Sequence, residues 1–295
     1  MDTISAKTIL QKNKSTDWFG SEYNMNLYKG CCHGCVYCDS RSDCYRIDDF
    51  ERVRAKENCL QILRDELRRK VRTGIIGTGA MSDPYNPFEE TELLTRHSLE
   101  LIDAFEFGAM VLTKSALITR DTDVLCSIAE HSPVLCQMTV TAADDSLSRL
   151  VEPNVSVSSE RFEALAKMSE NGLFTGIVMT PILPFIEDNE DNILRILRMA
   201  KECGVRSVYP MFGVTVRAGQ REYFYSKLEE NFPGSGIAER YAKTYGERYV
   251  CTSPSVKRLW KIFTEECEKL GLIYDMREII SAYKLGYGDS QLTFF

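Results

Sequence analysis

The chain has 295 residues, of which 44% are hydrophobic and 27% are charged, so it can bury a large core. No stretch approaches the roughly 18 apolar residues of a membrane span, and residues 1–14 lack the apolar run of a secretory signal. We therefore expect a cytoplasmic protein that binds no membrane. The formal net charge of −7 argues against direct binding to duplex DNA over a broad surface.

From residue 24 to about residue 216, short apolar runs alternate with helical patterns. Strands are expected at residues 24–28, 75–80, 110–113, 134–141, 176–180 and 207–211. Helices are expected at residues 49–71, 92–107, 122–130, 159–171 and 189–203. This alternation is typical of parallel βα units, and six units predict an α/β fold built on a partial (β/α)6 barrel of the TIM type.

Beyond residue 216 the alternation stops and the pattern becomes helical, as at residues 256–270 and 277–285. We divide the chain into an N-terminal lead segment (1–23), the partial barrel (24–216) and a C-terminal helical extension with its tail (217–295). The extension is expected to pack on the barrel.

Four of the eleven cysteines lie in the nine residues Gly-Cys-Cys-His-Gly-Cys-Val-Tyr-Cys, residues 30–38. In a reducing compartment, clustered cysteines are more often metal ligands or catalytic groups than disulfides. Cys31, Cys35 and Cys38 have C-x3-C-x2-C spacing, and the loop follows the first strand, at the mouth of the barrel. Three thiolates can hold a [4Fe–4S] cluster and leave one iron open to a substrate.

Two other interpretations remain open at this point. One is a structural zinc site formed by Cys32, Cys35, Cys38 and Cys44. The other is an iron–sulfur cluster with four protein ligands, which would only transfer electrons. A cosubstrate pocket would distinguish these classes, because neither alternative needs one. His33, inside the loop, is expected to be exposed rather than a ligand.

The cysteine loop, with the aromatic Tyr37 before its last cysteine, resembles that of the radical S-adenosylmethionine (SAM) enzymes. The stretches YKGCCHGCVYC, SDPYNPFEE, VLTKS, EPNVSVSSERFEAL and IVMTPILP occur in an order that resembles the spore photoproduct lyase-like branch, over about residues 24–211. The resemblance implies that the open iron binds the methionyl amine and carboxylate of SAM. One electron from an external donor of the flavodoxin or ferredoxin type then cleaves the sulfonium, and a 5′-deoxyadenosyl radical abstracts hydrogen from a substrate.

The resemblance also implies positions for the cosubstrate. Many radical SAM enzymes carry Gly-Gly-Glu at the end of the second strand, where this chain has Gly-Thr-Gly-Ala-Met-Ser-Asp-Pro-Tyr. Ser82 and Asp83 are then the polar groups nearest to the methionyl amine, although Asp-Pro is also a common start of a turn. Lys114 ends the third strand, and its cation suits a carboxylate. An ordinary surface lysine is the alternative, and the resemblance favours cosubstrate binding.

Three further residues complete the expected cosubstrate site. Thr139 and Thr141 lie two apart in a strand, so both hydroxyls point to one face and could meet the ribose or the methionyl group. Arg161 opens the next helix and could hold the methionyl carboxylate. Core packing of the threonines and a surface position for the arginine remain alternatives of similar weight.

The substrate is not determined by the sequence. Spore photoproduct lyase uses a cysteine hydrogen donor just before the Ser-Asp pair, whereas this chain has Ala80 and Met81 there. We therefore expect no repair of the thymine lesion, and peptide, nucleoside and small-metabolite substrates remain open.

The chain ends in Gln-Leu-Thr-Phe-Phe, residues 291–295, which resembles the peptide by which bacterial repair proteins dock on the sliding clamp. Gln291 would form a hydrogen bond at the rim of the clamp pocket, while Leu292 and Phe295 would fill apolar pockets. Phe294 stands where leucine is usual. A nucleic-acid lesion lyase recruited in this way is an alternative function, and a tail that folds back on its own barrel is an alternative structure.

Overall fold

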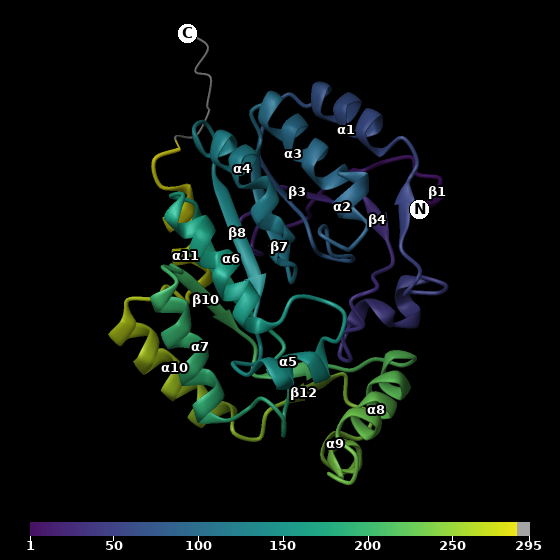
Figure 1. Ribbon diagram of the computed structural model, residues 1–295, viewed down its shortest axis with the longest axis vertical. Helices are drawn as coiled ribbons and strands as arrows, with labels where there is room; N and C mark the ends of the chain where they lie inside the picture. Colours follow the sequence, from purple (N-terminus) through teal and green to yellow (C-terminus); the bar gives the residue numbers. More distant parts are fainter. Residues whose placement is uncertain (288–295) are drawn as a thin grey trace.

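The computed structural model describes residues 1–287, and its centre is a seven-stranded sheet in the order β10-β9-β8-β7-β6-β3-β2 (Figure 1). Every neighbouring pair from β3 to β10 is parallel, and only β2 joins antiparallel, at one edge. The bounds are β2 Leu10–Lys12, β3 Tyr23–Met25, β6 Ile75–Gly77, β7 Gly108–Thr113, β8 Val134–Thr139, β9 Phe174–Met179 and β10 Ser207–Pro210.

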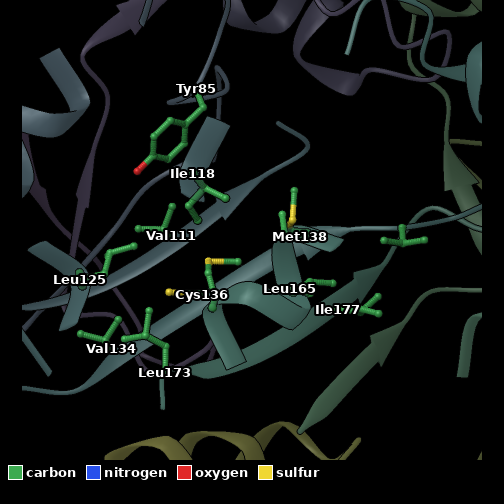
Figure 2. Close-up of a cluster of buried hydrophobic side chains, with 14 of the residues drawn as sticks. Tyr85, Val111, Ile118, Leu125, Val134, Cys136, Met138, Leu165, Leu173 and Ile177 are labelled. Atoms are coloured by element: carbon green, nitrogen blue, oxygen red, sulfur yellow. The ribbon is translucent and has the colours of Figure 1, made fainter. Parts of the chain in front are cut away.

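Helices cover the outside of this sheet (Figure 1), namely α1 Cys59–Arg68, α3 Leu94–Ala104, α4 Thr122–Ala129, α6 Ser158–Glu170 and α7 Glu190–Glu202. Alternate residues of β8 show why they pack there. Val134, Cys136 and Met138 point outward into an apolar cluster with Leu125 of α4 and Leu165 of α6 (Figure 2). Each of these helices therefore buries its apolar stripe on one face of the parallel strands.

Two short helices lie elsewhere. The single turn α2 (Glu89–Glu92) precedes α3, and α5 (Asp145–Val151) packs through Leu147 and Val151 against the apolar residues around Cys35.

The helix expected at residues 49–71 is wrong in its first half. The helix α1 begins only at Cys59, after Asn58 in a left-handed conformation (φ 53°). Before it, β5 (Arg54–Lys56) pairs with β1 (Asp2–Ile4) and with β4 (Tyr28–Lys29) in a second, three-stranded sheet. The alternation of buried Val53 and Ala55 with half-buried Arg54 has the period of a strand, which the charged composition of this stretch concealed.

The strand expected at residues 24–28 is divided between the two sheets, since β3 belongs to the large sheet and β4 to the small one. The lead segment also takes part in both sheets, through β1 and β2. Between β2 and β3 the chain places Trp18 edge-on against Tyr209 of β10, with ring centroids 5.5 Å apart. Aromatic side chains therefore connect the two edges of the large sheet, from the loop after β2 at one edge to β10 at the other.

After β10 the chain forms a small antiparallel pair of strands, β11 (Gly213–Thr215) with β12 (Val250–Thr252), and four helices, of which two lie between these strands in the chain. The helices are α8 Gln220–Asn231, α9 Ile237–Tyr245, α10 Val256–Leu270 and α11 Met276–Lys284. In Figure 1, α10 lies along α7, whereas α8 and α9 lie near the end of the sheet to which the strands point. Ile279 and Tyr283 of α11 are buried against Phe174 at the opposite end of the strands.

Among residues 1–287, no helix is both long enough and apolar enough to span a membrane. The residues of the expected clamp-binding peptide, Gln291, Leu292, Phe294 and Phe295, lie outside the described part of the chain.

The packing of α10 gives a stability prediction. Phe263 is fully buried, while Trp260 on the same helix stacks on it and is 46% exposed. Phe263→Ala should lower the free energy of unfolding by about 3–5 kcal/mol, because it removes a buried ring and leaves a cavity. Trp260→Ala is the control and should cost much less. Urea unfolding followed by circular dichroism measures both, and equal costs would show that α10 is not part of the core.

Candidate active site

A cavity of about 470 Å³ lies at the carboxyl ends of the central strands, where the cysteine loop meets the loops after β6 and β7. Functional groups of barrels and open parallel sheets gather at this edge. Most of the residues expected from the sequence line it, namely Cys31, Cys35, Tyr37, Cys38, Ser82, Asp83, Lys114 and Thr139. Residues that are up to 108 positions apart in the chain thus meet at one cavity.

Two glycines determine the path of the cysteine loop. Gly30 and Gly34 have φ values of +85° and +71°, which disfavour any residue with a side chain. A Cβ atom at Gly30 would also lie 2.6 Å from the carbonyl oxygen of Arg52. Just after this turn, the amide of Cys31 donates to the carbonyl of Phe50 at 2.8 Å.

Three of the four loop cysteines, Cys31, Cys35 and Cys38, line the cavity and are suited to a metal group that binds thiolates. Burial raises the pKa of Cys31 to about 12 and raises that of Cys35 well above its ordinary range, while the positive charge of Lys114 opposes the shift at Cys35. Metal ions bind the thiolate form and supply the positive charge that these buried sulfurs lack. The donor set and its burial therefore fit an iron–sulfur cluster.

A single zinc ion fits less well. Within residues 1–287, no three His, Cys, Asp or Glu side chains form a group that could hold one metal ion. Cys32 packs against the main apolar core, and the exposed Cys44 lies with its Sγ 3.4 Å from Nη1 of Arg217. The four sulfurs of the zinc interpretation thus lie in different surroundings. A cubane cluster does not require its sulfur ligands to surround one metal ion, because each thiolate binds a different iron.

His33 is buried, not exposed as expected from the sequence, and it lines the cavity. Its Nδ1 lies 3.6 Å from Oδ2 of Asp83, and burial lowers its pKa. This contact could not be predicted from the neighbourhood of His33 in the sequence, because its partner follows a different strand.

Asp83 both lines the cavity and joins two strand ends. Its carboxylate accepts hydrogen bonds from the hydroxyl of Thr113 at 2.6 Å and from the backbone amide of Lys114 at 2.9 Å. The loop after β6 is thereby attached to the end of β7. The turn role and the cavity role, weighed as alternatives from the sequence, are both compatible with this geometry.

Lys114 is half-buried and lines the cavity, with its ammonium 5.8 Å from the centre of the Tyr37 ring. In the described part of the chain, no carboxylate lies within ion-pair distance of this ammonium. Although burial alone would lower its pKa, the negative charges of Cys35 and Glu152 raise it. The cavity wall therefore carries a cation suited to an anionic ligand group.

Two of the expected cosubstrate residues do not line the cavity. The strand β8 ends at Thr139, so Thr141 lies beyond the alternation, and its hydroxyl donates to Glu187 at 2.8 Å. Arg161 is fully buried rather than on the surface, and it forms an ion pair with Glu152 at 2.5 Å. Its Nε and Nη1 are held by protein oxygens, whereas its Nη2 is buried without a hydrogen-bond partner among the described residues.

The radical SAM superfamily model matches residues 25–200 of the chain. The chain belongs to the radical SAM superfamily. As a radical SAM enzyme it uses a [4Fe–4S] cluster and S-adenosylmethionine, and such enzymes generally need an external reductant.

Among its relatives, an uncharacterized protein of Mycobacterium tuberculosis is 27% identical over 249 residues, covering 82% of this chain and 72% of the relative. One from Methanocaldococcus jannaschii is 32% identical over 174 residues, covering 58% and 64%. A spore photoproduct lyase mutant has a similar structure (TM-score 0.67, 16% identity), covering 92% of this chain and 80% of that one. The radical SAM methyltransferase TsrM of Kitasatospora setae is more distant (TM-score 0.55, 11% identity), with 90% and 58% covered. These structural similarities concern the fold.

Gly79, in the cavity wall of this radical SAM enzyme, gives a testable contrast with Gly172. The backbone is left-handed at both, with φ +85° at Gly79 and +83° at Gly172. A Cβ atom added at Gly79 would overlap the carbonyl oxygen of Leu112, whereas a Cβ atom added at Gly172 would have no atom within 4 Å. Gly172→Ala should cost only the left-handed strain of about 1–2 kcal/mol. Gly79→Ala should cost more and should weaken SAM binding, as measured by urea unfolding and calorimetry. Equal stability losses would refute the close approach to Leu112.

The buried Glu187, which the sequence did not single out, gives a pH prediction. Burial raises its pKa from 4.5 to about 8. The folded protein therefore keeps a proton that the unfolded chain releases, so this contribution to stability is complete below about pH 4.5 and is lost as the pH rises to about 8. Glu187→Gln should flatten the fall in unfolding free energy over this window, whereas the same change at exposed Glu163 should not. An unchanged pH slope would contradict the raised pKa.

Proposed function

We propose that Cys31, Cys35 and Cys38 ligate three irons of the [4Fe–4S] cluster and leave the fourth iron to S-adenosylmethionine. The observation that carries the proposal is the position of these cysteines on one cavity together with Lys114 and Asp83. When bound, the cluster and SAM supply a 5′-deoxyadenosyl radical, which abstracts hydrogen from the substrate. We further propose a flavodoxin- or ferredoxin-type electron donor.

The remaining cavity residues bind and orient SAM in this proposal. Lys114 pairs with the methionyl carboxylate, because its ammonium faces the cavity without a protein carboxylate in contact. Asp83 attracts the methionyl amine, and Ser82 and Thr139 offer hydroxyls beside them. Tyr37 contributes its ring to the wall, 5.8 Å from the Lys114 ammonium.

The proposal includes a division of the chain. Residues 24–216 form the partial (β/α)6 barrel, residues 1–23 lead into it, and residues 217–295 form a C-terminal helical extension and tail. The order of the large sheet and its six parallel strands support this assignment.

The substrate is left open by the proposal. Ala80 and Met81 line the cavity next to Ser82, where spore photoproduct lyase-like enzymes would carry a hydrogen-donating cysteine. Repair of the thymine lesion is therefore not part of the proposed function. Docking of residues 291–295 on a sliding clamp stays a prediction from the sequence.

The ligand assignment predicts a clear difference between neighbouring cysteines. Alanine at Cys31, Cys35 or Cys38 should abolish the visible absorbance of the anaerobically reconstituted cluster, since three ligands are the minimum for this site. Cys32→Ala is the matched control and should keep about four irons per chain. Iron, sulfide and zinc analysis measures the outcome. Stoichiometric zinc that disappears with Cys32 would overturn the radical SAM site.

The cosubstrate assignment predicts the effect of Lys114. Lys114→Met should weaken SAM binding to the reconstituted enzyme by about 1–3 kcal/mol, roughly 5- to 150-fold in dissociation constant, because a charged partner of the carboxylate is lost. Calorimetry measures the affinity, and production of 5′-deoxyadenosine with dithionite measures cleavage. Lys167→Met on α6, far from the cavity lining, is the control. Unchanged affinity in Lys114→Met would remove this lysine from the site.

A further inference from the structure

The cysteine loop is attached to a short segment, residues 151–154, which comprises the last residue of α5 and the three residues after it. The amide of Val36 donates to the carbonyl of Val151 at 3.0 Å, and the amide of Asn154 donates to the carbonyl of His33 at 3.1 Å. The side-chain amide of Asn154 donates to the carbonyl of Cys32 at 3.2 Å. The backbone on both sides of Cys35 is therefore bonded to this one segment.

Within this attachment, Tyr37 is held at both ends. It lies between Cys35 and Cys38 and is 6% exposed. Its hydroxyl donates to the carboxylate of Glu152, and its carbonyl accepts a hydrogen bond from Nε2 of Gln220 in α8 at 3.1 Å. One residue thus receives contacts from the 151–154 segment and from α8, the first helix after β11.

Glu152 is connected in turn to the central sheet. It is 2% exposed and pairs with Arg161 of α6 at 2.5 Å. Nη1 of Arg161 also donates to the carbonyl of Thr139, the last residue of β8, at 2.9 Å, and its Nε donates to the carbonyl of Ser156 at 2.8 Å. A continuous chain of bonds therefore runs from Tyr37 through Glu152 and Arg161 to a strand end that lines the cavity.

We propose that Glu152, fixed by Arg161, is a positioning residue that holds Tyr37 and thereby sets the place of the Cys35 and Cys38 thiolates relative to the cosubstrate end of β8. This inference rests on the proposed cluster ligation and deepens it. A buried carboxylate is stable only while its oxygens are paired, so its two donors keep a single arrangement. A ligand loop held in this way does not need to be ordered by the cluster itself.

Tyr37→Phe tests the inference, because it removes one hydroxyl and leaves the Glu152–Arg161 pair intact. Tyr85→Phe is the matched control. The Tyr85 hydroxyl also donates to a buried carboxylate, Asp121, at 3.0 Å, and Asp121 also pairs with an arginine, Arg120, at 2.8 Å. Tyr85 belongs to the apolar cluster of Figure 2 and lies outside the cavity lining.

The measurement is the rate at which the reconstituted enzyme loses iron to a ferrous chelator under anaerobic conditions, together with the electron paramagnetic resonance spectrum of the reduced cluster with SAM. We expect Tyr37→Phe to lose iron roughly five- to tenfold faster than wild type and to show a changed spectrum with SAM, because one buried hydrogen bond to the loop is gone. Tyr85→Phe should match the wild type in both. The melting temperature of the cluster-free protein should be lowered equally in the two variants. Faster iron loss in Tyr37→Phe alone would then reflect the position of the loop and not general stability.

A double-mutant cycle tests whether Glu152 acts through Tyr37. Glu152→Gln should speed iron loss in the wild-type background and add little in the Tyr37→Phe background. Independent effects of the two changes, or a Tyr37→Phe variant that keeps iron as long as wild type, would overturn the inference. If the wild-type protein itself takes up no [4Fe–4S] cluster, the proposed function fails instead.

Discussion

The buried ion pair between Glu152 and Arg161 connects two parts of the molecule that line the cavity, the cysteine loop and the end of β8. Its carboxylate accepts a hydrogen bond from the hydroxyl of Tyr37 in the cysteine loop, and its guanidinium donates one to the carbonyl of Thr139 at the end of β8. Neither charge has contact with water, so the loss of one partner would leave the other buried and unpaired, at a cost of several kcal/mol. The pair thus fixes the distance between the ligand loop and the sheet.

The remaining cavity groups depend on the parallel sheet in a simpler way. Consecutive parallel strands end at one edge, so residues just after β6, β7 and β8 become neighbours without any special contact. Asp83 adds a direct connection, because one carboxylate binds both the hydroxyl of Thr113 and the amide of Lys114. Position in the sheet brings the groups near each other, and such hydrogen bonds orient them.

The difference between neighbours placed by the sheet and contacts placed by tertiary packing explains how much could be predicted from the sequence. The six parallel strands of the seven-stranded sheet and the placement of Cys31, Asp83 and Lys114 follow from local patterns, and the radical SAM family is confirmed. The alternation predicted for Thr139 and Thr141 does not reach Thr141, because it holds only within a strand and β8 ends at Thr139. The sequence did not indicate the partner of Arg161, because Glu152 meets it only through tertiary packing. The cosubstrate role of both residues stays a prediction. His33 and Gln220 were missed for the same reason, since nothing in their neighbourhood in the sequence indicates what they contact.

The bridge between the two edges of the large sheet has a consequence for the cavity. On that side the cavity lining includes Trp18, which packs on Tyr209 and is 47% exposed. The backbone at the outer edge of β10 is hydrogen-bonded to Ile273 and not to β2. An exposed side chain changes its rotamer within nanoseconds, whereas a strand would have to break its ladder of hydrogen bonds, so this part of the lining can adapt to a ligand faster than the strands around it.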